Sequence, residues 1–319
     1  MRKIAWILVV SAVIGTTLSA QERNDVIKVY NEGAKLIQTD VKAAVDAFEK
    51  VVALSEQVGE TANDLKQKAI QVLPGLYLRV ANNTLKESKS APEIIKTAKK
   101  AAAAAEKYGN TSVKENAGKI MVQGYNIMAT DFFTRKDYEK ALLAFDSLLL
   151  INPGYLNAIY NKALIYRSQN NTGAFEETID LFLGKLESGK DDERMKQASA
   201  IALEYFRAAG SQANQADKLD EALILLNKAA KYGTDKDLFY YFADVYNKQK
   251  NFNGGAEYAQ KGLDLETGDA EAKAKFFYQI AVAQAGKGQN ANACNSFKNA
   301  IYGAFAEASK AQRKNLKCE

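Results

Sequence analysis

Histidine is absent from all 319 residues, and cysteine occurs only at positions 294 and 318. Without histidine the chain has no Ser-His-Asp or Cys-His catalytic group, no histidine-ligated zinc or iron, and no histidine-based pH switch. Two cysteines cannot complete a thiolate zinc site. The phosphate-binding motifs G-x-x-x-x-G-K-[ST] and G-x-G-x-x-G are also missing. The sequence therefore predicts no metal site and no nucleotide site.

Carboxylates are the remaining groups that could do chemistry, and 38 residues are Asp or Glu. A pair of them could act as acid and base in hydrolysis, but no pair stands out. Residues 264–269, Asp-Leu-Glu-Thr-Gly-Asp, differ from a calcium loop in the offsets of the glycine and the acidic residues. They fit a helix end, a glycine turn and an aspartate that opens the next helix. We expect no catalytic residue, no cofactor and no enzymatic activity.

The first 20 residues have the composition of a cleavable secretory signal. Arg2 and Lys3 form a basic start, residues 4–14 are apolar apart from Ser11, and residues 15–20 end in small and polar types. The apolar run is shorter than the roughly 20 residues that cross a membrane, although an uncleaved anchor remains the alternative. The sequence predicts cleavage after Ala20 and a periplasmic or secreted protein without a membrane span.

Export bears on the two cysteines and on the charge. In an oxidising compartment Cys294 and Cys318 are expected to form a disulfide that closes a loop of about 25 residues and contributes on the order of 3 kcal/mol. Two free thiols are the alternative. The formal charge of +5 falls to +3 without Arg2 and Lys3, and it is spread along the chain. That is no concentrated field for nucleic acid, so we expect no nucleic-acid partner.

The elements that would position any site are helices. Only 3 residues are proline, and runs of alternating apolar and polar residues between turn signals are missing. Residues 135–158 show the pattern best, since an amphipathic helix stops at Asn152-Pro153-Gly154 and another begins at once. Proline ends the first helix and sets the turn, which predicts a hinge between stacked helical hairpins.

Apolar and small residues recur at fixed offsets in this region. The clearest copy is Tyr125, Met128, Ala129, Phe132, Ala141, Phe145, Leu148 and Pro153. These offsets are those of the tetratricopeptide repeat, W-x2-L-G-x2-Y followed by A-x3-F-x2-A-x4-P, and the segment resembles that family with Tyr for Trp and Ala for Gly. Further copies start at Ile159, Phe239 and Phe277. The resemblance covers about 22–303, is strongest in 121–170 and 237–303, and suggests an exported, bacterial-type member.

The resemblance implies an all-α fold, a right-handed α-solenoid of about seven helical hairpins with a C-terminal capping helix. We divide the chain into a signal peptide at 1–20, degenerate hairpins at 21–120, tetratricopeptide-like repeats at 121–303 and the cap at 304–319. A first helix with Ile201, Ala202 and Tyr205 comes before a second helix with Ala222, but the spacing between the two is eight residues longer than in the repeat pattern. Residues 211–218 are therefore predicted to be an inserted polar loop.

In this family the first helix of each hairpin lines a concave groove that binds peptides or other proteins. Its groove-facing positions follow the Trp-like site by 1, 5 and 8 residues. From them we select as candidate partner-binding residues Asn126, Phe133, Tyr160, Arg167, Tyr240, Asp244 and Tyr278. The lysine and asparagine with which some members clamp a C-terminal carboxylate are absent here.

Tyr160, Tyr240 and Tyr278 share one slot, and tyrosine offers large contact area with a hydroxyl for hydrogen bonding. Alternatively, these rings only pack against neighbouring hairpins. The leading hypothesis is a monomeric, non-enzymatic protein-binding scaffold of the cell envelope, whose partner is another envelope protein or peptide. The first alternative is a self-associating structural component, because the ends of repeat arrays can stack, although the polar, lysine-rich helix at 308–317 argues against it. The second is a glycan-binding groove, but the only tryptophan, Trp6, lies in the predicted signal.

Overall fold

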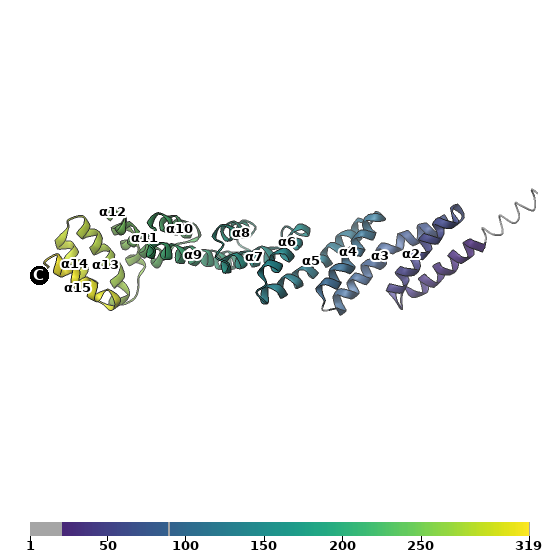
Figure 1. The fold of residues 1–319 in the computed structure, drawn as a ribbon, viewed down its shortest axis with the longest axis horizontal. Coiled ribbons are helices and arrows are strands. Elements are labelled where there is room, and N and C mark those ends of the chain that lie inside the picture. The colour runs from purple at the N-terminus through teal and green to yellow at the C-terminus, as the bar shows by residue number, and fades with distance from the viewer. Residues whose placement is uncertain (1–20, 89, 319) are drawn as a thin grey trace, which may run out of the picture. The chain divides into compact units, whose positions relative to one another are not determined.

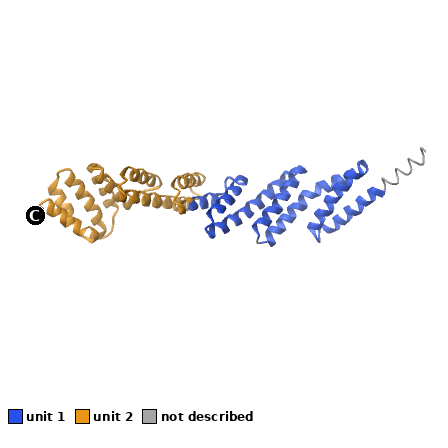
Figure 2. Cartoon of the chain, viewed as in Figure 1, with its two compact units in different colours: residues 1–165 blue, residues 166–319 orange. Residues whose placement is uncertain are grey.

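The computed structural model describes residues 21–88 and 90–318, and it forms two compact units (Figures 1 and 2). Unit 1 ends at Ile165 and unit 2 begins at Tyr166. The predicted signal at 1–20 lies outside the described residues. Across the described ranges all regular structure is helical, and consecutive helices pair as hairpins, which confirms the all-α, tetratricopeptide-like fold class.

The described part of unit 1 begins with helical residues 21–36 and continues through six further α-helices and one short 3-10 helix. They are α2 (Val41–Val58), η1 (Glu60–Ala62), α3 (Asn63–Glu87), α4 (Ala91–Lys107), α5 (Thr111–Thr134), α6 (Tyr138–Ile151) and α7 (Leu156–Ser168), whose last residues belong to unit 2. α3 runs uninterrupted through Pro74. The small residues Ala129 and Ala141 are fully buried, as the repeat pattern predicts, because they let α5 and α6 approach closely.

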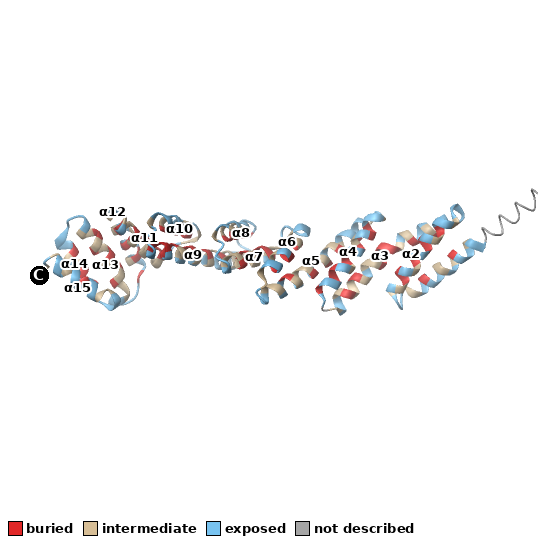
Figure 3. Ribbon diagram, viewed as in Figure 1, coloured by how far each residue is buried: buried red, intermediate tan, exposed pale blue. Residues whose placement is uncertain are grey.

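Unit 2 contains a further set of helices in the same alternating arrangement. They are α8 (Thr172–Gly184), α9 (Asp192–Gln215), α10 (Leu219–Tyr232), α11 (Lys236–Lys248), α12 (Phe252–Leu265), α13 (Ala270–Gly286), α14 (Asn290–Asn299), η2 (Gly303–Phe305) and α15 (Ala306–Asn315). Asp269 accepts a hydrogen bond from the backbone N–H of Ala272 and so caps α13, as expected for the acidic stretch at 264–269. Figure 3 shows buried and exposed residues interleaved along these helices, the pattern of amphipathic packing.

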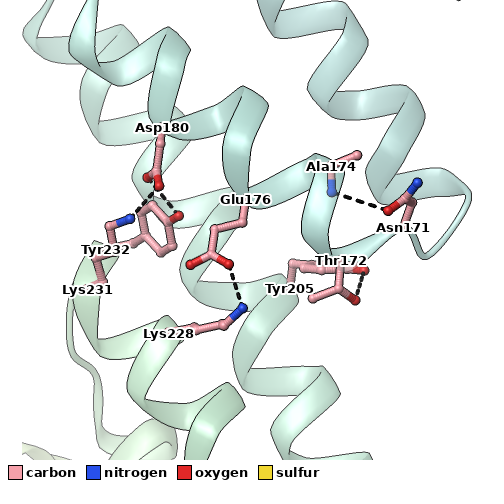
Figure 4. Close-up of polar contacts among 9 residues, drawn as sticks. All are labelled: Asn171, Thr172, Ala174, Glu176, Asp180, Tyr205, Lys228, Lys231 and Tyr232. Atoms are coloured by element: carbon pink, nitrogen blue, oxygen red, sulfur yellow. Dashed lines mark hydrogen bonds and ion pairs between the residues drawn. The ribbon is translucent and has the colours of Figure 1, made fainter.

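Charged side chains tie α8 to α10 within unit 2 (Figure 4). Glu176 of α8 pairs with Lys228, and Asp180 pairs with Lys231. The hydroxyl of Tyr232 also donates to Asp180, with 2.9 Å between the oxygens. Burial and the neighbouring carboxylates raise the pKa of Tyr232, so the phenol stays a donor. These contacts hold α8 against the second helix of the following hairpin.

In five hairpins, the turn between the two helices contains one residue in the left-handed region. These residues are Lys136 (φ 61°), Asn170 (φ 53°), Asp217 (φ 58°), Lys250 (φ 60°) and Gly288 (φ 72°). Each lies eleven residues after the residue in the Trp-like slot, namely Tyr125, Ile159, Phe206, Phe239 and Phe277. The recurrence at one position fixes the register of all five repeats.

Exchanging residues at this turn position should change stability in opposite directions. Gly288→Lys is expected to lower the free energy of unfolding by about 1 kcal/mol, because the left-handed region is strained for a residue with a Cβ. Space is not the cause, since a Cβ at Gly288 meets nothing within 4 Å. Lys250→Gly should be neutral to stabilising by about 0.5 kcal/mol. Thermal melts followed by circular dichroism would measure both, and equal destabilisation by the two changes would contradict the assignment.

The predicted polar loop at 211–218 is wrong. α9 continues to Gln215, and Ser211, Ala213 and Asn214 are buried on it. The turn between the two helices consists only of residues 216–218, since α10 begins at Leu219. Residues 211–215 continue the helix, and three of their side chains are buried against neighbouring helices. The prediction failed because it relied on the polarity of these residues alone.

The register of this repeat also differs from the predicted one. Phe206, Ala209, Gly210 and Ala213 have the offsets of W-x2-L-G-x2-Y and stand at the regular distance before Ala222. A Cβ at Gly210 would lie 2.7 Å from Cδ2 of Leu226, so glycine permits the close approach of α9 and α10. The eight additional residues therefore precede Phe206 as an extension of the α9 N-terminus, and no loop is inserted.

The C-terminal segment is attached to the last hairpin covalently and by packing. Cys294 of α14 and Cys318 form a disulfide with 5.6 Å between their Cα atoms. The hydroxyl of the fully buried Ser309 donates to the carbonyl of Ala300 at 3.2 Å. Leu316 packs on the cluster of Ala281, Ala293 and Phe297. The helix expected at 304–319 thus forms as η2 followed by α15, and α15 lies against α14.

Within residues 21–88 and 90–318, none of the helices has both the length and the apolar character that a membrane span needs.

Candidate partner-binding face

Three of the predicted partner-binding residues belong to unit 1. Asn126 and Phe133 are half-buried on α5, and Tyr160 is half-buried on α7. The ring of Phe133 packs against that of Tyr138, with 6.2 Å between centroids. Phe133 therefore contributes to the packing of its own hairpin, between the end of α5 and the start of α6.

The other four lie in unit 2. Arg167, at the end of α7, points its Nη2 toward Oε2 of Glu204 on α9 at 3.4 Å. This ion pair is partly exposed and is worth little for stability. Tyr240 and Asp244 lie on α11, and Tyr278 lies on α13. The structure brings these last three residues together across two neighbouring first helices.

The rings of Tyr240 and Tyr278 contact the chain's own C-terminal segment. Phe305, the last residue of η2, lies 6.4 Å from the ring centroid of Tyr240 and 5.3 Å from that of Tyr278. Tyr278 also packs edge-on against Phe297 at 5.6 Å, and Tyr240 against Phe276 at 6.2 Å. The rings of both tyrosines therefore pack against other aromatic residues of the chain.

Asp244 is the centre of a set of hydrogen bonds that joins three first helices. Its Oδ2 accepts from Nδ2 of Asn214 on α9 at 2.6 Å, and its Oδ1 accepts from Nε2 of Gln279 on α13 at 2.9 Å. Nζ of Lys248 lies 3.3 Å from Oδ2 of Asp244 and donates to Oδ1 of Asn214 at 2.8 Å. The carboxylate is therefore held in place by three polar neighbours.

Asn247 extends this set into the interior. Its Nδ2 donates to both the backbone O and Oε1 of Gln279, each at 2.9 Å. Asn247 is buried, and it fits only because Gly255 of α12 has no side chain there. We call Asn214, Asp244, Asn247, Lys248 and Gln279 the polar network. It fixes the spacing of α9, α11 and α13 and presents hydrogen-bonding groups in a defined arrangement.

The charge of Asp244 acts on both tyrosines. Burial, followed by the charge of Asp244, raises the pKa of Tyr240 to about 12, although a hydrogen bond with Gln279 acts in the opposite direction. The pKa of Tyr278 is raised by the same two causes in the same order. Both phenols are neutral near pH 7 and can donate hydrogen bonds, which suits recognition of a polar or anionic group.

The raised pKa of Tyr240 predicts that the stability of the protein depends on pH in the alkaline range. An unfolded tyrosine loses its proton near pH 10, whereas folded Tyr240 keeps it up to about pH 12. The contribution of Tyr240 to stability is therefore fully present below pH 10 and is lost between pH 10 and about pH 12. A difference titration of tyrosinate absorbance between the natural protein and Tyr240→Phe should show this transition. Asp244→Asn should move it to lower pH, and an unmoved transition would contradict the assigned role of Asp244.

Sequence reasoning missed Asn214, Lys248, Gln279 and Phe305. Asn214 was hidden by the wrong loop at 211–218, and in the corrected register it occupies the same slot as Asn247. That repetition of asparagine eight residues after Phe206 and Phe239 is the signal that could have found it. Phe305 carries no such signal, because it stands where the repeat pattern has its proline.

No family model matches the chain, and no curated protein matches its sequence. Among solved structures, the chain is similar to the MamA protein, with 18% sequence identity, coverage of 62% of this chain and 96% of that chain, and a TM-score of 0.35. YrrB, described as a TPR protein with an unusual peptide-binding site, has 17% sequence identity and a TM-score of 0.34. The match covers 56% of this chain and 84% of that chain. A tetratricopeptide repeat protein from Parabacteroides merdae has 18% sequence identity and a TM-score of 0.28, and the match covers 93% of this chain and 99% of that chain. At these identities the comparison concerns the fold alone.

Within residues 21–88 and 90–318, no group of three or more Cys, Asp or Glu side chains is arranged to hold a metal ion. The groups gathered on α9, α11 and α13 are amides, one carboxylate, one ammonium and two phenols. Such a set can form directional hydrogen bonds with a partner, but it contains no nucleophile paired with a base.

Proposed function

We propose that this protein is a non-enzymatic binding scaffold of the cell envelope. The proposed binding surface is the partner-binding face, formed by the first helices α9, α11 and α13 of unit 2 around Tyr240, Asp244 and Tyr278. The observation that carries the proposal is the polar network, which joins these three helices by hydrogen bonds and includes Gln279, the hydrogen-bond partner of Tyr240. A preorganised set of donors and acceptors lowers the entropic cost of binding a peptide.

The test separates the hydroxyls from the packing of the rings. Tyr240→Phe combined with Tyr278→Phe keeps both rings against Phe305 and removes only the polar groups. The matched control is Tyr246→Phe with Tyr258→Phe, two tyrosines that stack on each other at 5.5 Å between α11 and α12 of the same hairpin. Each variant and the natural protein would be used for affinity capture from an envelope extract, with retained proteins identified by mass spectrometry.

A protein retained by the natural chain and the control, but lost by Tyr240→Phe/Tyr278→Phe, is the expected result. Equal retention by all three would place the binding surface elsewhere. Tyr160→Phe, made separately, tests whether unit 1 takes part. Circular dichroism would show that each variant is folded.

We also propose that the chain is exported and that residues 1–20 direct this step. The disulfide between Cys294 and Cys318 supports an oxidising compartment. N-terminal sequencing of the protein from an envelope fraction should begin at Gln21. A chain that keeps Met1 and whose two thiols are alkylated without prior reduction would contradict export.

A monomer is the proposed state. α15 covers the end of the last hairpin and carries the exposed residues Glu307, Lys310 and Lys314. A polar end helix discourages stacking of one copy on another. Light scattering during size-exclusion chromatography should give the mass of one chain, and a mass that grows with concentration would favour the self-associating alternative.

A further inference from the structure

We propose that unit 1 carries a second binding site, a lysine-lined cavity between α4 and α5 that takes a short acidic, partly apolar segment of another protein. The cavity has a volume of about 600 Å³. Its lining residues are Pro92, Ile95, Lys96, Lys99, Lys100, Ala103, Tyr125 and Met128. This proposal is independent of the partner-binding face, which lies in unit 2.

The floor of the cavity is formed by apolar groups of α4 and α5, among them Ile95, Tyr125 and Met128. Near one end, α4 and α5 are in close contact, because a Cβ at Gly124 would lie 2.8 Å from Cγ1 of Ile95. Farther along α4, Ala103 supplies only a methyl group. Tyr125 and Met128, which occupy the Trp and Leu slots of the repeat, are half-exposed. The uncovered surface can accept an apolar side chain.

The rim of the cavity is positively charged. Lys96, Lys99 and Lys100 are spaced at i, i+3 and i+4, so their side chains share one turn of α4. Within the described ranges no carboxylate pairs with any of them, and no acidic residue lines the cavity. Nζ of Lys99 lies 5.8 Å from the ring centroid of Tyr125, above the apolar floor. Three ammonium groups beside apolar surface complement carboxylates that flank an apolar residue.

A neighbouring cavity of about 340 Å³ is lined by acidic as well as basic residues. It shares Lys96 and Lys100, but it is also lined by Asp46, Glu49 and Glu93. Those acids offset the lysines there, and Glu49 also accepts the hydroxyl of Tyr77. Lys99 lines only the cavity between α4 and α5, where no acidic residue lies among the lining residues.

A peptide fits this geometry better than a membrane surface. The cations are confined to one helical turn, and the apolar residues form one small, shallow patch beside them. A membrane surface would engage basic residues spread over a wide outer face. One or two apolar side chains flanked by Asp or Glu match both the volume and the charge.

The experiment uses a short fluorescein-labelled peptide in which Glu and Asp alternate with Leu and Phe. Binding to the purified protein is followed by fluorescence anisotropy at low and at high salt. Lys96→Glu/Lys99→Glu/Lys100→Glu should weaken binding at least about tenfold. The matched control, Lys28→Glu/Lys35→Glu/Lys50→Glu, makes the same charge change on exposed lysines of unit 1 and should leave binding within about twofold.

A second variant separates shape from charge. Ala103→Trp fills the hollow, keeps all three lysines and should also weaken binding about tenfold, because Ala103 is exposed and its replacement does not disturb the core. Equal weakening by the two lysine variants would reduce the effect to general attraction and overturn the proposal. So would full binding by Ala103→Trp, the absence of saturable binding, or tighter binding to phosphatidylglycerol vesicles than to the peptide.

Discussion

Gly255→Ala is expected to destabilise unit 2 by about 2 kcal/mol, although alanine is the better helix former. A Cβ at Gly255 would lie 2.6 Å from Cγ of Asn247 and closer still to its Oδ1. Asn247 cannot move away easily, because it is buried and donates twice to Gln279. Hydrogen exchange of α11, α12 and α13 would locate the loss, and thermal melts would give its size.

Gly75→Ala is the matched control, since Gly75 lies inside α3 and a Cβ there meets nothing within 4 Å. That change should raise stability by about 0.5–1 kcal/mol. Adding Asn247→Ala to Gly255→Ala should recover part of the loss, because it removes the overlapping atoms. If Gly255→Ala were as harmless as Gly75→Ala, Asn247 would not lie against Gly255 and the polar network would be wrongly placed.

The disulfide gives the second large effect. Replacing Cys294 and Cys318 by alanine removes a link across 24 residues and should lower the local stability of α14 and α15 by about 3 kcal/mol. Amide hydrogens of α15 should then exchange roughly a hundredfold faster. Unit 1 provides the internal control, because its exchange rates should not change.

Unchanged exchange in α15 would mean that packing alone holds the end helix, through Ser309 and Leu316. The measurement reports on the segment itself and does not require the whole chain to unfold in one step, which repeat arrays often do not.

Much of the fold could be predicted because each hairpin repeats the same local physics. Tyr125, Ala129, Ala141 and Phe145 have the spacing of two closely packed helices, and the structure places them so. Stacked hairpins contact mainly their sequence neighbours, so the pattern of one repeat predicts its packing without knowledge of distant residues.

The register of α9 could not be settled by that pattern alone. Ala202 and Gly210 are both small, both buried and both on the same helix, so either fits the glycine slot. The left-handed residue Asp217 resolves the choice, but its backbone conformation is not visible in the sequence. Polar side chains at 211–218 then favoured a loop, since burial of Ser211 and Asn214 depends on the neighbouring helices.

The candidate face was predicted in part. The groove-facing positions of the repeat selected Tyr240, Asp244 and Tyr278, which the structure brings together. It could not supply Asn214 and Gln279, because their hydrogen bonds to Asp244 cross between hairpins and span about 30 residues. Nor could it supply Phe305, whose position depends on how the C-terminal segment folds back.

The polar network also bears on how unit 2 loses its structure. In the nearest-neighbour description of repeat proteins, stability is a sum of terms for single hairpins and terms for the contacts between successive hairpins. Hydrogen bonds that run from Asn214 through Asp244 and Gln279 to Asn247 contribute to two successive contact terms. Stronger contact terms make neighbouring hairpins unfold together. The last three hairpins therefore behave as one cooperative block, and a ligand held by any one of them stabilises all three.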